Sequence, residues 1–297
     1  MKNSTKKNLS TLVNDIYDTV ADLNIGEKEI PDELLADVTA GIGNAIIEWA
    51  TPRDRSNSVL RMSSIGKPAR QLYYEDKYKE STPPDAATLI KFLYGHILEE
   101  LLLFLVKLAD HEVTDQQKEV TVKKIKGHMD CKIDGEVVDV KSASGFSFKK
   151  FQHGTLRDSD PFGYMYQLAG YEKAEGTDNG GFLAINKESG EIALYQPEEL
   201  DKPNVEDRID NLVNMLGTKE MPSKCYQPIP AGTKGNMKLP IGCVYCNHKF
   251  KCHADTNNGK GLRIFKYARG PEYLTTVVSP PKVEEITHAK TTHLKNK

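Results

Sequence analysis

The stretch Gly127–Lys141, GHMDCKIDGEVVDVK, decides the fold of the middle of this chain. Its Asp134-Gly135 pair is a strong signal for a two-residue hairpin loop, because a type I′ turn needs positive φ at both positions. With that loop the strands pair outward, with Ile133 opposite Glu136, Lys132 opposite Val137, Cys131 opposite Val138 and Asp130 opposite Asp139. The stretch therefore predicts an antiparallel hairpin in which two aspartates face each other.

Side chains alternate between the two faces of this hairpin. One face is apolar and is expected to pack on a core; it carries Met129, Cys131, Val138 and Val140. The other face is polar; it carries His128, Asp130, Asp139 and Lys141. Directly opposed residues have Cβ atoms about 5 Å apart, and like charges placed there repel each other. A divalent cation between Asp130 and Asp139 would remove the repulsion, with Lys141 beside it; a solvated open face is the alternative.

Residues 86–109 contain the strongest helix pattern in the chain, apolar nearly all round, so we expect a buried helix. Glu99 and Glu100 lie inside it, close to Gly95 and His96. A carboxylate in so apolar a helix is costly unless it is paired or binds a metal; its alternative is to reach solvent at the helix edge. With the hairpin aspartates, one glutamate completes a set of oxygen ligands of the kind that Mg²⁺ or Mn²⁺ prefers.

A cysteine run forms a second candidate metal site. Its members are Cys243, Cys246 and Cys252, in a C-x2-C-x5-C pattern, with Cys225 upstream. The surrounding segment 222–260 is rich in Pro, Gly and Asn and has little periodicity, which is typical of a segment held by a metal instead of an apolar core. Four thiolates suit zinc or an iron–sulfur cluster, and His248 or His253 could replace one of them at zinc.

The length and composition of the chain limit the number of domains and the class of protein that it can be. The chain has 297 residues, enough for one large domain or one domain with appendages, and five cysteines. Its net charge of -2 is not typical of nucleic-acid-binding proteins, which are often basic. Basic residues nevertheless cluster just after the hairpin: Lys141, Lys149, Lys150 and Arg157. No secretory signal or membrane-spanning stretch is visible, so we expect a cytoplasmic protein. Cysteines in such a chain favour metal ligation or plain thiols over disulfides.

The order of the expected elements predicts the architecture. Helices are expected at 9–24, 32–50, 69–79, 86–109, 161–174 and 203–217, and strands at 117–126, in the hairpin, at 180–186 and at 191–196. This order predicts an α/β core with a mixed sheet flanked by helices. The expected division is an N-terminal helical appendage (1–58), the core (59–221), a Cys-rich metal-binding segment packed on the core (222–278) and a polar tail (279–297).

Four motifs in chain order resemble those of the PD-(D/E)XK nuclease superfamily. They are Gly95-x-x-x-Glu99, Gly127-x-x-Asp130, Asp139-x-Lys141 and Gln167-x-x-x-Tyr171, where the last pair shares one helix face. The pattern is similar to that of the RecB-like exonuclease branch, in which QxxxY follows the catalytic lysine. The cysteine run resembles that of CRISPR-associated iron–sulfur nucleases, and the overall pattern resembles exonucleases of tailed bacteriophages. The resemblance covers roughly residues 61 to 252.

The resemblance implies a restriction-endonuclease-like core and a deoxyribonuclease, most simply an exonuclease acting on single-stranded or duplex DNA ends in phage-type recombination, replication or degradation. It implies catalytic roles for Glu99, Asp130, Asp139, Lys141, Gln167 and Tyr171. It implies that Mg²⁺ or Mn²⁺ is held by Glu99, Asp130, Asp139 and the Val140 carbonyl. It implies that an iron–sulfur cluster, or Zn²⁺, is held by Cys225, Cys243, Cys246 and Cys252. A bacterial host cytoplasm, a recombination or replication partner protein and an oligomeric state would all be compatible with such a role.

Two departures from the family pattern keep alternatives open. Many RecB-like members have His in the helix motif, whereas this chain has Glu99. A glutamate at this position resembles the pattern of phage recombination exonucleases. Iron–sulfur members place their first cluster cysteine near residues 66–70, where this chain has none, so either Cys225 supplies the fourth ligand or the ion is zinc. The alternative functions are a structure-selective endonuclease of the same fold and a non-catalytic nucleic-acid-binding module.

Overall fold

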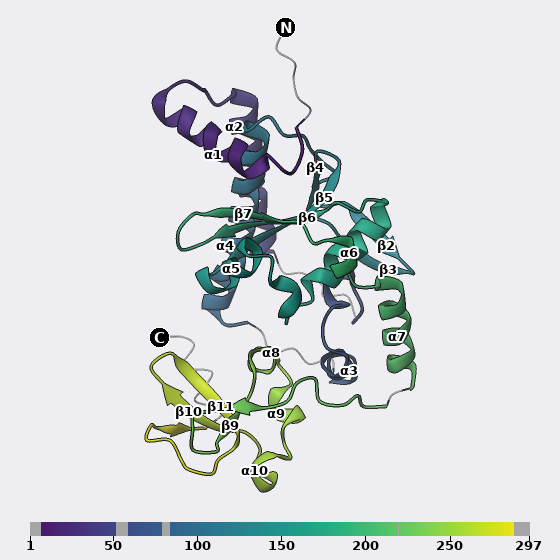
Figure 1. The fold of residues 1–297 in the computed structure, drawn as a ribbon, viewed down its shortest axis with the longest axis vertical. Helices are drawn as coiled ribbons and strands as arrows, with labels where there is room; N and C mark the ends of the chain where they lie inside the picture. The colour runs from purple at the N-terminus through teal and green to yellow at the C-terminus, as the bar shows by residue number, and fades with distance from the viewer. Residues whose placement is uncertain (1–6, 52–58, 79–83, 219, 288–297) are drawn as a thin grey trace. The chain divides into compact units, whose positions relative to one another are not determined.

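The computed structural model describes residues 7–51, 59–78, 84–218 and 220–287 (Figure 1), so parts of the predicted N-terminal appendage and tail lie outside the described residues. The chain divides into two compact units. The first unit comprises residues 1–66 and 90–210, and the second unit comprises residues 67–89 and 211–297. Within the described residues, no helix is both long enough and apolar enough to cross a membrane.

The first unit is built on a five-stranded sheet in the order β1-β4-β5-β6-β7. Its strands are β1 (Val113–Thr114), β4 (Cys131–Ile133), β5 (Glu136–Ala143), β6 (Gly181–Asn186) and β7 (Ile192–Tyr195). Strands β5 and β6 run parallel, whereas the other neighbours are antiparallel. The predicted α/β fold with a mixed sheet is therefore confirmed, and β5 is its central strand.

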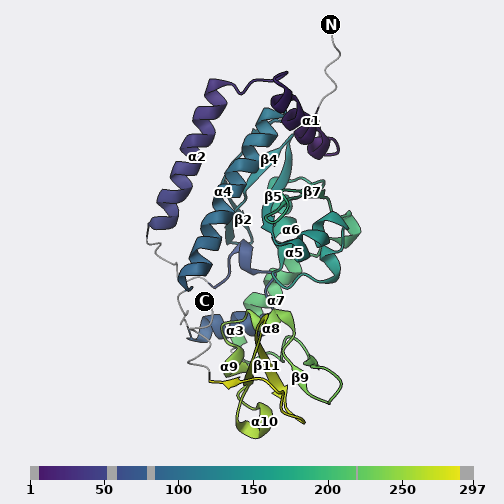
Figure 2. The same ribbon diagram turned by 90° about the vertical axis from the view of Figure 1, so that its left-hand side faces the viewer.

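Helices cover both faces of this sheet (Figure 2). The helices that belong wholly or partly to this unit are α1 (Leu12–Ile25), α2 (Asp32–Ala50), α4 (Ala86–Leu108), α5 (Gly145–Gln152), α6 (Tyr164–Glu175) and α7 (Val205–Thr218), with short 3₁₀ turns at Met62–Ser64, Leu156–Asp158 and Glu199–Asp201. Apolar residues of α1 and α4 pack on Val138 and Val140 of β5, while α5 and α6 lie on the opposite face. Because strand side chains alternate, Asp139 and Lys141 face α6.

The predicted hairpin forms with the predicted register. Ile133 pairs with Glu136, Lys132 with Val137 and Cys131 with Val138. The loop residues Asp134 and Gly135 have φ of 52° and 91°, as a type I′ turn requires. The predicted pairing of Asp130 with Asp139 is wrong, because β4 begins only at Cys131.

Two sequence predictions in the first unit need correction. The expected strand at 117–126 is instead a separate hairpin of β2 (Glu119–Val122) and β3 (Ile125–His128), because Lys123 and Lys124 take positive φ and reverse the chain. Helix α4 is buried only in its C-terminal half, from Leu102 onward, whereas Phe92 and Tyr94 are exposed. Its apolar first half is therefore not core.

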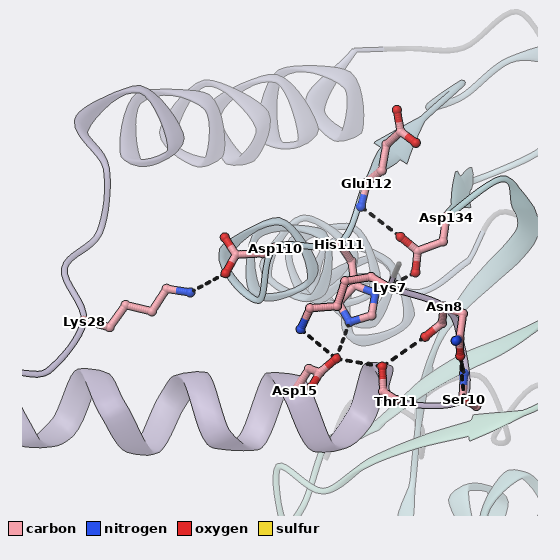
Figure 3. Close-up of polar contacts among 10 residues, drawn as sticks. All are labelled: Lys7, Asn8, Ser10, Thr11, Asp15, Lys28, Asp110, His111, Glu112 and Asp134. Carbon is pink, nitrogen blue, oxygen red and sulfur yellow. Dashed lines mark hydrogen bonds and ion pairs between the residues drawn. The ribbon is translucent and has the colours of Figure 1, made fainter. Parts of the chain in front are cut away.

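A buried histidine fastens α1 to the hairpin loop (Figure 3). His111, which follows α4, has Nδ1 2.6 Å from an Asp134 oxygen and Nε2 3.0 Å from an Asp15 oxygen. Both ring nitrogens can donate only when the imidazole carries both protons. Asp15 also meets the Lys7 ammonium and the Thr11 hydroxyl. The loop that joins β4 and β5 is thus fixed from the side of α1.

The second unit has a sheet of its own, in the order β12-β10-β11-β9-β8 with antiparallel pairing. Its elements are α3 (Ala69–Tyr78), β8 (Ile229–Pro230), β9 (Met237–Lys238), α8 (Ile241–Val244), α9 (Lys249–Cys252), α10 (Thr256–Gly259), β10 (Arg263–Tyr267), β11 (Gly270–Thr276) and β12 (Glu285–Ile286). Leu239, Ile264, Tyr273 and Ile286 form its apolar core. The expectation that this region lacks an apolar core is therefore wrong.

Candidate active site and cysteine pocket

The candidate active site begins on β5, where Asp139 is the polar residue in a run of buried valines. Its side chain has no solvent exposure, and no backbone N–H or hydroxyl of the described residues donates to its carboxylate oxygens. The carboxylate instead contacts the ammonium of Lys141, two residues further along the same strand face. An ionised carboxylate buried in this way is costly unless a cation satisfies it.

Asp130 reaches the same strand through its side chain. Its Oδ2 accepts a 2.7 Å hydrogen bond from the backbone N–H of Val140. The two aspartates are thus brought together by a side-chain contact to β5 instead of the cross-strand pair expected from the sequence. The expectation of a solvated hairpin face is also excluded, since Asp139 is fully buried.

Glu99 arrives from α4. A Cβ added at Gly95, one turn earlier, would lie 3.7 Å from the Ser142 hydroxyl, so α4 approaches β5 closely at this point. Glu99 Oε1 accepts a 2.7 Å hydrogen bond from Gln117 Nε2, in the loop before β2. Glu100 points elsewhere on the helix and lies close to Gly41 of α2. Of the two glutamates, Glu99 joins the site.

These acids lie close enough to Lys141 and to one another for their charges to shift one another's pKa. Burial, followed by the charge of Asp130, raises the pKa of Glu99 from 4.5 to about 8. Burial also raises the pKa of Asp139 to about 7 and raises the pKa of Asp130. Burial alone would lower the pKa of Lys141, but Asp139 and Asp130 raise it. The site therefore holds more acidic groups than one lysine could neutralise if all of them were ionised.

Gln167 and Tyr171 lie on α6, where the sequence placed them. Gln167 Nε2 donates a 3.1 Å hydrogen bond to the Tyr171 hydroxyl. Tyr171 is buried; burial, then the charge of Asp139, raises its pKa. The pair therefore lines the inner side of the acid cluster.

Two further residues at this site escaped the sequence reasoning. The Lys141 ammonium lies 5.1 Å from the centroid of the Tyr164 ring, a cation–π contact. Tyr164 precedes Gln167 by three residues, so helical spacing puts them on one face and could have suggested it. Gln117, the partner of Glu99, lies in a loop and has no such local signal.

The donor chemistry of this cluster fits a hard divalent cation. Three carboxylates from three segments lie within electrostatic reach of one another, and the Lys141 ammonium is the partner of the Asp139 carboxylate. Such oxygen sets suit Mg²⁺ or Mn²⁺. In the described residues, however, no three His, Cys, Asp or Glu side chains converge with ligand spacing, since Asp139 is turned to Lys141 and Asp130 to Val140.

The four predicted cysteine ligands line one pocket of the second unit, although no three of them converge closely enough to hold a metal ion in the part of the chain that the structure describes. Cys225, Cys243, Cys246 and Cys252 line one small pocket with Arg70, Tyr74 and His253. Burial and the neighbouring thiol of Cys225 raise the pKa of Cys243 to about 12. Arg70 donates to the Pro222 carbonyl and is hydrogen-bonded to Cys252, which raises its pKa although burial opposes this. His248 stacks on Tyr74 instead, at a centroid distance of 5.5 Å.

Comparison with known proteins adds resemblances of fold. No protein-family model matches the chain, and no curated protein matches it. Solved structures similar to it include SSO0001, at 18% identity and a TM-score of 0.43, covering 73% of this chain and 95% of that one. An alkaline exonuclease from Laribacter hongkongensis matches at 12% identity and a TM-score of 0.37, covering 51% and 78%. A phage-related exonuclease from Haemophilus somnus 129PT matches at 16% identity and a TM-score of 0.33, covering 54% and 89%.

Proposed function

We propose that this protein is a metal-dependent deoxyribonuclease that hydrolyses phosphodiester bonds, and specifically an exonuclease acting on DNA ends. The observation that carries the proposal is that Asp139 and Lys141 of β5 are buried in contact with each other and lie within electrostatic reach of Asp130 and Glu99. Strongly perturbed carboxylates around one lysine are typical of catalytic sites, because structure alone gains little from them.

Glu99, Asp130, Asp139 and the Val140 carbonyl would hold Mg²⁺ or Mn²⁺. When bound, the ion would lower the pKa of water and neutralise charge on the phosphate oxygens. For Asp139 to serve as a ligand, its carboxylate must give up part of its contact with the Lys141 ammonium and turn toward the metal. That exchange would free the ammonium for the substrate.

Lys141 would act on the reacting atoms as a positive point charge. Its ammonium contacts the Asp139 carboxylate and lies over the face of Tyr164, so the aromatic ring would keep it near the acids once Asp139 turns to the metal. A preorganised charge of this kind stabilises the negative charge that develops on phosphate and orients the attacking water. Gln167 and Tyr171 would support the acids from α6 and help to place the DNA backbone.

The test is a Mn²⁺-dependent digestion of end-labelled linear DNA. Lys141→Ala is expected to abolish cleavage and leave DNA binding largely intact. Lys126→Ala, which removes an exposed lysine of β3 paired with Glu119, is the matched control and should cleave normally. Cleavage by Lys141→Ala at the wild-type rate would refute the assignment, and wild-type binding without cleavage would favour a non-catalytic module. A closed circular DNA distinguishes an exonuclease from an endonuclease of the same fold. The exonuclease would leave the circle intact because it needs an end, whereas the endonuclease would cut it.

We further propose that the cysteine pocket holds a structural metal, either an iron–sulfur cluster or zinc. The ligands would be Cys225, Cys243, Cys246 and Cys252, since all four thiols line the same pocket. Thiols with raised pKa values are neutral without metal, so a bound cation would have to displace their protons. Visible absorption by the purified protein would identify the cluster, and a colourless protein with stoichiometric zinc would exclude it.

A further inference from the structure

A pocket of about 220 Å³ lies beside Lys141 in the first unit. It is bounded by the end of β5, the start of α5, the loop before α6 and the turn after β6. The lining residues that matter here are Lys141, Ser144, Ser147, Phe162, Tyr164 and Lys187. The pocket thus shares Lys141 with the acid cluster, but none of the three acids lines it.

One side of this pocket is an aromatic stack that starts at the catalytic lysine. The Tyr164 ring carries the Lys141 ammonium and stacks on Phe162, with centroids 5.5 Å apart and an interplanar angle of 29°. Phe162 is 48% exposed, a large value for an aromatic ring next to a buried acid cluster. Exposed aromatic rings of this kind are the platforms on which proteins stack unpaired bases.

The other side of the pocket supplies polar and cationic groups. Lys187, in the turn after β6, is exposed, and no acidic side chain of the described residues pairs with its ammonium. The hydroxyls of Ser144 and Ser147 line the same pocket. The backbone N–H of Gly145 at the start of α5 is already taken by the Glu188 carboxylate, at 3.0 Å. An anion in this pocket would therefore be met by lysine and serine side chains and not by the helix end.

We propose that this pocket holds one unpaired nucleotide of the DNA strand being cut, with its base on Phe162 and its phosphate near Lys187 and the serine hydroxyls. The inference rests on the proposed nuclease function and adds to it a substrate requirement. A base that stacks on Phe162 in this pocket would be separated from its pairing partner, so the strand must be single-stranded or frayed where it meets Lys141.

The test uses a single-stranded oligonucleotide carrying one 2-aminopurine at successive positions, with Ca²⁺ in place of Mn²⁺. Wild-type protein is expected to change the fluorescence strongly at one position. Phe162→Ala should abolish that change and weaken binding about tenfold, the loss expected from one base–aromatic stack. Lys187→Ala should weaken binding and make it less dependent on salt. The control is Phe146→Ala, which removes a ring that is 81% exposed on α5 but does not line the pocket.

The possible outcomes separate the two proposals. Wild-type affinity and an unchanged fluorescence pattern in Phe162→Ala would overturn the nucleotide pocket and leave the nuclease proposal standing. Equal losses in Phe146→Ala and Phe162→Ala would also overturn it, because stacking would then not be specific to this pocket. Failure of the folded wild-type protein to bind any DNA would overturn the nuclease function itself. Urea unfolding of each variant shows that it is folded under the binding conditions.

Discussion

Replacing Glu99 with Gln is expected to stabilise the metal-free protein at alkaline pH. The substitution keeps the shape of the side chain and an oxygen that can accept the hydrogen bond from Gln117. It removes one of three carboxylates from a buried site. The pKa of Glu99 is raised from 4.5 to about 8 by burial and by Asp130. Each pKa unit is worth 1.36 kcal/mol, so ionised Glu99 costs the fold up to about 4 kcal/mol at pH 8.

Proton linkage gives the direction in which the free energy of unfolding changes with pH. Between about pH 4.5 and pH 8 the unfolded chain has lost the Glu99 proton, whereas the folded chain keeps it. Rising pH therefore favours the unfolded state across this window, and the effect is absent below pH 4.5. Glu99→Gln carries no such proton. The variant should equal the wild type near pH 4.5 and exceed it in stability by roughly 2–4 kcal/mol at pH 8.

Urea unfolding at pH 4.5 and pH 8 with EDTA measures this difference directly. The control is Glu27→Gln, which removes an exposed carboxylate from the same unit and should leave the pH dependence unchanged. Adding Mg²⁺ at pH 8 should then stabilise the wild type more than Glu99→Gln, because a ligand that binds only the native state raises its stability. Identical pH dependence in the wild type and Glu99→Gln would refute the clustering of acids from which the nuclease proposal is drawn.

Three other substitutions test the fold and the second site. Gly127→Ala should destabilise the protein by about 1–3 kcal/mol in urea unfolding, because the new Cβ would lie 2.4 Å from the Cβ of Met62, whereas Gly43→Ala meets no atom within 4 Å and should cost nothing. His111→Ala should lower the unfolding free energy by about 3 kcal/mol, since it leaves two carboxylates without their shared partner; an unchanged urea midpoint would contradict this. Cys246→Ser should melt below the wild type, and a chelator should lower the wild type to the same temperature; equal melting before chelation would exclude Cys246 as a ligand.

Local chemistry explains why the three hairpin pairs nearest the loop were predicted correctly. The Asp134-Gly135 loop fixes the turn type, and the length of the loop fixes which residues of the two strands pair. The chain segment therefore specifies its own register before any distant contact forms. The acid set follows from that register, because Asp139 and Lys141 must share a face once Val138 and Val140 share the other.

Long-range contacts explain what could not be predicted. Gln117 meets Glu99 only because a loop and a helix pack together, and no spacing in the sequence encodes that meeting. Asp130 contacts β5 through a backbone N–H, which cross-strand pairing rules do not describe. In the second unit, strands β10 and β11 went unrecognised because the cysteine-rich stretch before them favoured a metal-held segment over a sheet.

The position of Asp139 argues that the site was kept for chemistry at the expense of stability. Its strand β5 is the central one of five, and its neighbours Val138 and Val140 are buried apolar residues that a sheet interior favours. A valine at position 139 would bury without desolvating a charge, whereas the aspartate there must be compensated by Lys141. Replacing such a pair with apolar residues is often stabilising. An arrangement of three acids and an amine around the central strand supports our proposal that this strand holds charge for a ligand.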